Sequence, residues 1–167
     1  GTFLTPRGGF DPNINKESVD QHNFAMQTVT ILQNQKGKDT AIIRAASART
    51  APEDLEKVVL DSVSADVFDE AGNTTTITAK SGEYNMTTRF LTLTKDVVVN
   101  KIKEKQFMYT ELLHYDGEQR KVNSPGKTRL KSENAEINGG SLDYDITTQS
   151  YVIGKRVKCL IEGFIEP

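Results

Sequence analysis

A short phrase occurs three times along this chain: a small residue, then a tyrosine five positions later, then a turn-forming residue. The copies are Ala79–Asn85, Thr110–Asp116 and Gly139–Asp145. A fainter copy, Ala45–Ala51, has threonine in the place of the tyrosine. The first residues of the four copies are spaced 34, 31 and 29 residues apart. Self-similarity at this period predicts one supersecondary unit stacked on itself.

The segments around the phrase have the composition of β-strands. Residues 59–68 alternate apolar and polar side chains, and residues 74–79 are mostly β-branched. Turn signals such as Asp116–Gly117 and Asn138–Gly139 separate such segments, and no helical periodicity follows residue 27. The pattern predicts an all-β fold, a single-domain open β-jellyroll or twisted sandwich of repeated antiparallel strands.

The phrase itself suggests how each corner of the fold is built. The small residue permits a tight corner, and the tyrosine is expected to cover that corner with its hydroxyl at the edge. Asn85, Asp116 and Asp145 are expected to supply the turns that follow.

Residues 1–25 differ from the rest because they are rich in proline, glycine and polar residues. We predict a flexible N-terminal linker over residues 1–25 and one β-domain over residues 26–167, a length that suits a single domain. No run of apolar residues is long enough to span a bilayer, and no signal peptide opens the sequence. The chain begins with glycine rather than methionine, so the sequence leaves open whether another segment precedes it.

Composition argues against several function classes. A net charge of -2 and a pI near 5.8 disfavour nucleic-acid binding. The two histidines, His22 and His114, have no partner at metal-ligand or triad spacing, so neither a metal nor a cofactor is expected. Cys159 is interpreted as a small buried residue. Asp143 and Asp145 are interpreted as part of a solvated turn rather than a catalytic pair, and no enzymatic activity is predicted.

Four segments, 77–85, 91–99, 109–116 and 140–145, together resemble the LptC family, whose fold is close to LptA and OstA-type domains. The resemblance covers roughly residues 41–162. It implies a periplasmic, non-enzymatic component of lipopolysaccharide export, anchored to the inner membrane by a preceding helix. It also implies partners: lipopolysaccharide, an inner-membrane ABC transporter at the N-terminal edge, and an LptA-like bridge protein at the C-terminal edge.

Within that resemblance, strand alternation selects candidates for an apolar groove that would hold acyl chains. These candidates are Val59, Val63, Val67, Ile77, Leu91, Leu93, Leu113, Tyr115, Leu142, Tyr144, Val157 and Ile161. The phosphates of the lipid call for basic residues at the mouth, and Arg44, Arg49, Arg120 and Lys121 are the candidates.

Three alternatives stay open at this point. The chain could be a soluble LptA-like bridge protein, an adhesin-like β-repeat that binds protein alone, or a carbohydrate-active β-sandwich enzyme. A continuous apolar groove would favour a lipid-transfer protein over the adhesin-like module. A convergent pair of buried carboxylates would favour the enzyme.

Overall fold

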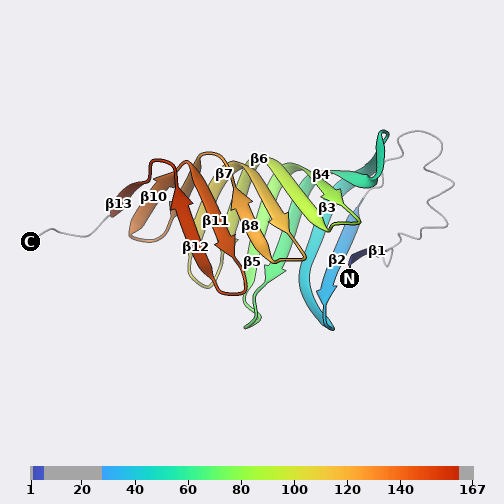
Figure 1. Cartoon of the computed structure of the whole chain (residues 1–167), viewed down its shortest axis with the longest axis horizontal. Helices are drawn as coiled ribbons and strands as arrows, with labels where there is room; N and C mark the ends of the chain where they lie inside the picture. Colours follow the sequence, from blue (N-terminus) through green and yellow to red (C-terminus); the bar gives the residue numbers. More distant parts are fainter. Residues whose placement is uncertain (1, 6–27, 162–167) are drawn as a thin grey trace, which may run out of the picture.

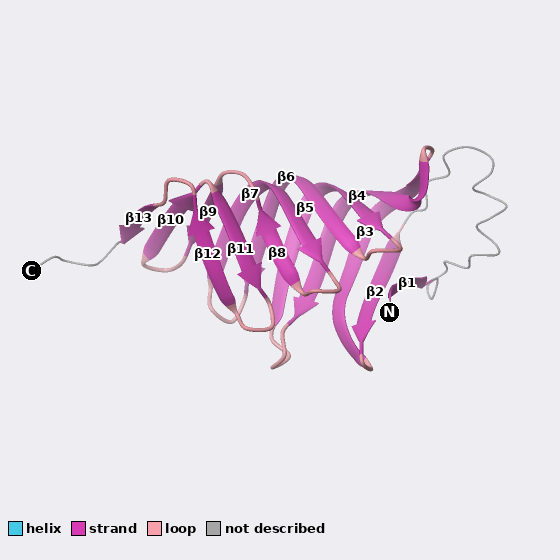
Figure 2. Cartoon of the chain, in the orientation of Figure 1, coloured by secondary structure: helices cyan, strands magenta, loops and turns pink. Residues whose placement is uncertain are grey.

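The computed structural model describes residues 2–5 and 28–161, and the side chains of residues 28–160. Its described part is a single 13-stranded antiparallel sheet (Figures 1 and 2), which confirms the all-β prediction. The strands are β1 (Thr2–Thr5), β2 (Val29–Gln35), β3 (Lys38–Ala51), β4 (Asp54–Phe68), β5 (Thr74–Asn85), β6 (Phe90–Lys101), β7 (Gln106–Asp116), β8 (Lys121–Ser124), β9 (Thr128–Lys131), β10 (Ala135–Gly139), β11 (Ser141–Asp145), β12 (Ser150–Gly154) and β13 (Lys158–Ile161).

The sheet divides into two branches at β7. Strands β1 to β7 lie side by side in chain order. The last residues of β7, His114–Asp116, pair with β8, whereas residues Phe107–Thr110 pair with β9. One branch continues as β8, β11 and β12, and the other as β9, β10 and β13. In Figure 1 the first branch lies in front of the second, and apolar side chains from both join one core.

The five long strands β3 to β7 change which residues face inward at one point. In β3, β4, β5 and β7 two consecutive residues face outward between inward-facing runs, and in β6 three do, Thr94–Asp96; the pairs are Ala46–Ser47, Asp61–Ser62, Lys80–Ser81 and Glu111–Leu112. They form a row across the sheet, because Ser47 pairs with Asp61 and Asp61 with Ser81. Left-handed backbone at Ser62, Lys95 and Asp96 marks irregularities that bend strands. We call this row the fold line, because the sheet bends there and its two halves face each other.

Beyond β7 the bend falls between strands. The chain crosses from one branch to the other at residues 125–127, at Gly140 and at residues 155–157. Gly140 is required for this crossing, since an added Cβ would lie 2.5 Å from the Cβ of Lys155. The Gly140 N–H donates to the carbonyls of Gly154 and Lys155. Strand pairs β8–β9, β10–β11 and β12–β13 are therefore three further bent units.

The three tyrosine phrases end in the same hairpin turn. Asn85, Asp116 and Asp145 each accept hydrogen bonds from the backbone N–H groups two and three residues later. This confirms their predicted role as turn residues. The fifth residue after each tyrosine has φ values of 63°, 60° and 63°; these residues are Arg89, Arg120 and Gln149.

A repeated backbone hydrogen bond joins each of these hairpins to the next. The Gly117 N–H donates to the carbonyl of Arg89 (3.1 Å), and the Ile146 N–H donates to the carbonyl of Arg120 (3.0 Å). In both bonds the donor is the second residue after one tyrosine and the acceptor is the fifth residue after the preceding tyrosine. The sequence period therefore reflects hairpins stacked side by side, as predicted.

Strand β1 changes the interpretation of the N-terminal segment. Residues 2–5, which the sequence analysis placed in a flexible linker, pair antiparallel with β2 and extend the sheet. The unpaired backbone groups of an edge strand favour such an addition. The rest of the predicted linker, residues 6–25, lies outside the described residues, and the described residues of the predicted domain, 28–161, form one continuous sheet.

Candidate functional site

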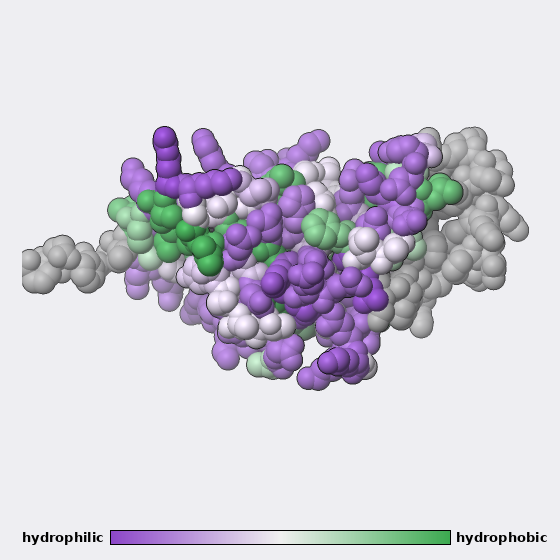
Figure 3. Space-filling model, viewed as in Figure 1, coloured by the Kyte–Doolittle hydropathy of each residue, from purple (hydrophilic) through white to green (hydrophobic). Residues whose placement is uncertain are grey.

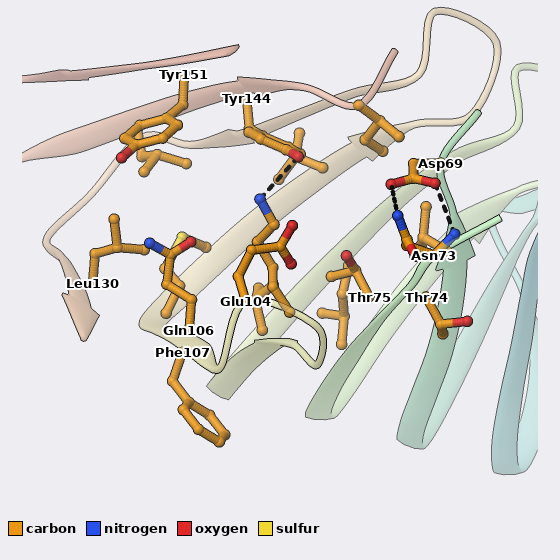
Figure 4. A pocket seen from close by; sticks show the side chains of 18 residues that line it. Asp69, Asn73, Thr74, Thr75, Glu104, Gln106, Phe107, Leu130, Tyr144 and Tyr151 are labelled. Carbon is orange, nitrogen blue, oxygen red and sulfur yellow. Dashed lines mark hydrogen bonds between the residues drawn. The ribbon is translucent and has the colours of Figure 1, made fainter. Parts of the chain in front are cut away.

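A cavity lies between the two branches, near the C-terminal half of the sheet (Figure 4). Strands β4 to β7 and β9 line it on one side, and β8, β11 and β12 line it on the other. Its apolar lining includes Val67, Ile77, Val99, Met108, Val122, Leu130, Leu142 and Ile146. The cavity has a volume of about 50 Å³, which is far below the roughly 300–1,000 Å³ of sites that hold drug-sized ligands. The apolar interior is therefore nearly closed in this structure.

Polar side chains form the rim of the cavity. The Lys101 ammonium donates to the Tyr144 hydroxyl at 3.0 Å and lies 4.5 Å from the centre of its ring. This contact joins β6 to β11, in the branch of β8, β11 and β12, across the rim. Glu104 and Gln106, at the β6–β7 turn, lie on the same rim (Figure 4).

Asp69, in the β4–β5 turn, makes a second contact with the branch of β8, β11 and β12. Its carboxylate accepts hydrogen bonds from Asn73 within its own turn and from Gln149 of the β11–β12 hairpin, at 2.9 Å. Slight burial disfavours the charged carboxylate, but the hydrogen bonds from Asn73, Ala71 and Gly72 outweigh it and lower the pKa of Asp69.

The interior next to β2–β5 is closed by a buried arginine. Arg120 is 4% exposed, and its guanidinium donates to the Tyr115 hydroxyl (2.5 Å), the Thr40 carbonyl (3.3 Å) and the Phe68 carbonyl. Its Nε has no hydrogen-bond partner among the described residues. Burial raises the pKa of Tyr115, although the Arg120 charge opposes that shift. Arg120 lies in the turn directly before β8, whereas Thr40 belongs to β3 and Phe68 to β4. These bonds therefore hold the β7–β8 hairpin against β3 and β4.

Gln33 closes the same region further toward β2. Its amide nitrogen donates to the Tyr84 hydroxyl at 3.0 Å and to the Arg89 carbonyl at 3.4 Å. Gln35 donates to the carbonyls of Gly117 and Glu118. Tyr84 and Tyr115 are both fully buried, so the expectation of edge hydroxyls is wrong for these two. Their hydroxyls point inward because long side chains from distant strands reach them there.

Four of the twelve predicted groove residues line the cavity: Val67, Ile77, Leu142 and Tyr144. Five others are buried in the packed core away from it; these are Val63, Leu91, Leu93, Leu113 and Tyr115. The side chain of Ile161 lies outside the described residues.

The inward placement of two candidates is wrong. Val59 is half-buried on the outer face, between the buried Val58 and Leu60, because the alternation of β4 reverses at the fold line. Val157 is 51% exposed at the crossing between β12 and β13. Cys159 is also exposed rather than buried.

The basic candidates are not grouped at the rim. Arg44 pairs with Asp66 at 3.1 Å on the outer face, and Arg120 is buried in the interior. Arg49, which is also on β3, and Lys121, on β8, are exposed. Sequence alternation could not separate these environments, because Arg120 enters the interior from a turn.

Sequence reasoning missed most of the cavity lining, since it selected only four of the eighteen lining residues. Val99, Met108 and Leu130 alternate with less buried neighbours in β6, β7 and β9, so their pattern was a usable signal. Tyr151 and Ile146 offered none, since one lies on an exposed strand and the other in a turn.

Two kinds of feature are absent from the described residues. No helix there is long and apolar enough to cross a membrane. No group of three or more histidine, cysteine or acidic side chains within residues 2–5 and 28–161 is arranged to hold a metal ion.

The bent single sheet and its apolar interior define an open β-jellyroll domain. The structure is similar to the crystal structure of LptH, the LptA-homologous periplasmic component of the conserved lipopolysaccharide transport device from Pseudomonas aeruginosa. The TM-score is 0.56 at 16% sequence identity, over 73% of this chain and 94% of that chain. At this identity the likeness shows a shared fold. Comparison with curated proteins found no match.

The family model described as LptC, lipopolysaccharide-assembly, LptC-related, matches residues 5–162. Because this match spans nearly the whole chain, the chain belongs to the LptC-related family, as its sequence resemblance implied. It is therefore a component of lipopolysaccharide transport, and the LptC- and LptA-like proteins are periplasmic components of the cell envelope.

Proposed function

We propose that this protein binds lipopolysaccharide and passes it along a periplasmic bridge from an inner-membrane ABC transporter toward the outer membrane. The acyl chains would lie between the two branches of the sheet, in contact with Ile77, Met108 and Leu142. The observation that carries this proposal is the apolar cavity between the branches, with polar groups confined to its rim. An apolar interior binds acyl chains by removing them from water and needs no reacting group.

The size of the cavity makes a widening step part of the proposal. A volume of about 50 Å³ is too small for a lipid chain, so the branches must separate for the ligand to enter. The contacts across the rim are few there: Lys101 to Tyr144 and Gln149 to Asp69. Both are at least partly exposed, and partly exposed polar contacts are cheap to exchange for water.

The two ends of the sheet suit the proposed neighbours. At the C-terminal end Val152 is 67% exposed and Leu160 is 60% exposed, and hydrophobic residues gather on this end in Figure 3. An edge strand with exposed apolar side chains favours strand addition by another sheet. The LptA-like bridge protein is placed at this end and the transporter at the opposite edge, β1. A membrane anchor preceding the chain belongs to the same proposal.

Photo-crosslinking tests the proposal. A photoreactive amino acid at Ile77 or Leu142 is expected to label lipopolysaccharide strongly, whereas the same probe at the exposed position Lys131 is expected to label it weakly. A probe at Leu93, in the packed core, reports whether the ligand travels past the cavity. Equal labelling from Leu142 and Lys131 would contradict binding between the branches.

No observation favours the carbohydrate-active enzyme. Among the described side chains no aspartate or glutamate is buried, and Asp145 caps its turn while Asp143 accepts a hydrogen bond from Asn123.

A further inference from the structure

A second concave surface lies outside the apolar interior, where the fold line reaches the C-terminal branches. This basic cleft is lined by the side chains of Lys127, Arg129, Lys155, Arg156 and Lys158, and it encloses about 1080 Å³. The cleft draws on β6, β7, β9 and β10 and on the crossing between β12 and β13. Val98 and Tyr109 line the cleft, and their chain neighbours Val99 and Met108 line the cavity. The two pairs of side chains face opposite sides of the sheet.

The five cations of the basic cleft are not neutralised by the described part of the chain. All five are exposed, and none forms an ion pair with a carboxylate of residues 28–160. Arg129 lies 4.7 Å from the centre of the Tyr109 ring, a contact that orients the guanidinium and keeps its charge. In a chain with a net charge of -2, five such cations in one cleft create a strong local positive field.

The acidic residues near the cleft are already engaged. Asp96 and Glu111 lie in its lining. Asp96 pairs with Lys80 at 2.9 Å, a contact that raises the pKa of Lys80, and Glu111 accepts a hydrogen bond from the Asp96 N–H. Glu136, one strand away on β10, accepts a hydrogen bond from Asn138. Of these carboxylates only Asp96 has an ion-pair partner, and the lining holds five cations against the two carboxylates of Asp96 and Glu111, so its charge balance is positive.

Two buried threonines border the cleft. Thr110 and Thr128 line it and are 6% and 4% exposed. Their hydroxyls are linked through Ser124, at 2.8 Å and 2.7 Å. Each hydroxyl donates to a backbone carbonyl, Thr110 to Lys127 and Thr128 to Gly126. The exposed lysine and arginine side chains are therefore the donors that the cleft offers to phosphate oxygens.

Two places along the chain have the same left-handed backbone geometry but carry different charges. Lys155 and Arg156 are two consecutive residues with left-handed φ, 58° and 65°. Lys95 and Asp96 have the same geometry, 70° and 53°, on β6. There one cation sits beside a carboxylate, whereas the C-terminal pair places two cations together.

We propose that the basic cleft is a binding site for phosphate groups. The site is separate from the cavity and does not depend on the proposed function, because the strands β6, β7 and β9 lie between them. The phosphate can belong to a soluble ligand or to the headgroup of an anionic lipid, and the cleft presents the same donors to both.

Titration of the intact chain with two probes tests this site. One probe is inorganic pyrophosphate, followed by calorimetry, and the other is vesicles containing phosphatidylglycerol, followed by co-sedimentation against vesicles of phosphatidylcholine alone. The double variant K155Q/R156Q is expected to weaken binding roughly 30-fold, since each cation near an anionic surface contributes a factor of roughly five. Binding is also expected to fall as salt is raised.

The matched control is K103Q/K105Q, which removes the same charge from the exposed β6–β7 turn. It is expected to leave binding within about twofold of the unchanged protein, because these lysines lie outside the cleft. Pyrophosphate binding without vesicle binding assigns the site to a soluble phosphate, and selective binding to the anionic vesicles assigns it to a lipid headgroup. Binding to neither probe, or an equal loss in the two double variants, overturns the proposal.

Discussion

The interior of this protein has two halves that are closed in different ways. The half next to β2–β5 is packed around two fully buried tyrosines, and Gln33 and Arg120 bind their hydroxyls inside. The other half holds the cavity, and its tyrosine, Tyr144, is bound by Lys101 at a partly exposed rim. The same repeated phrase thus produces a locked layer contact at one end and a loose one at the other. The difference indicates where the branches can separate.

The largest expected effect compares two leucine deletions. Leu113→Ala is expected to lower the free energy of unfolding by about 4 kcal/mol, because Leu113 is fully buried in the packed half. Leu142→Ala is expected to cost only about 2 kcal/mol, since Leu142 already borders a cavity and loses fewer contacts. Urea unfolding followed by circular dichroism measures both. Equal costs would show that the two halves are packed alike.

Replacing the buried cation tests the lock directly. Arg120→Met is expected to destabilise the fold by about 2 kcal/mol, because the Thr40 and Phe68 carbonyls lose their donor, while relief of a buried charge offsets part of that loss. Lys121→Met, on the exposed neighbour, serves as the control and should change stability by less than about 0.5 kcal/mol. If Arg120→Met leaves the free energy of unfolding unchanged, packing alone holds β3 and β4 against the β7–β8 hairpin.

Hydroxyl deletion separates the two tyrosine environments. Tyr115→Phe is expected to cost about 1.5 kcal/mol, because it removes one acceptor from a buried guanidinium. Tyr144→Phe should cost less than about 0.5 kcal/mol, since Lys101 can turn to water. If the comparison is right, Tyr144→Phe also increases crosslinking of lipopolysaccharide from Leu142. Unchanged crosslinking would show that the contact between Lys101 and Tyr144 does not control the widening of the cavity.

The smallest effect concerns acid stability at the hairpins. The Thr147 hydroxyl and the backbone N–H groups of Thr148 and Thr147 donate hydrogen bonds to the Asp145 carboxylate and lower its pKa. A group whose pKa is lower in the folded state stabilises the protein above its unfolded pKa, and this contribution is lost as pH falls through the folded pKa. Asp145→Asn should therefore flatten the stability profile below about pH 4. Asn85 occupies the same position in its own hairpin, so the turn should survive; an unchanged profile would contradict the assignment.

The repeat and the turns could be read from the sequence because both depend on neighbours along the chain. Asn85, Asp116 and Asp145 bind N–H groups two and three residues away, and such contacts are local. Placement of Val59 failed because the fold line reverses the alternation in the middle of β4. That reversal follows from a bend shared by five strands, and the composition of β4 alone does not show it.

The cavity was only partly predictable for a related reason. Val67, Ile77 and Leu142 were found by alternation, but the same rule selected Leu91 and Leu93, which lie in the packed half. Alternation says which side chains face inward and not whether the opposite layer fills the space. Arg120 was predicted at a mouth, yet it fills interior space that apolar residues would otherwise have to occupy.

The sequence by itself determined the all-β class, the stacked hairpins and the family, since periodicity and turn chemistry are written in short segments. Only the tertiary structure decided which tyrosine receives a buried partner, where the interior stays open, and how lysines and arginines from residues 127–129 and 155–158 gather in one cleft. These outcomes join groups far apart in the chain, and the bend and branching of the sheet bring them together.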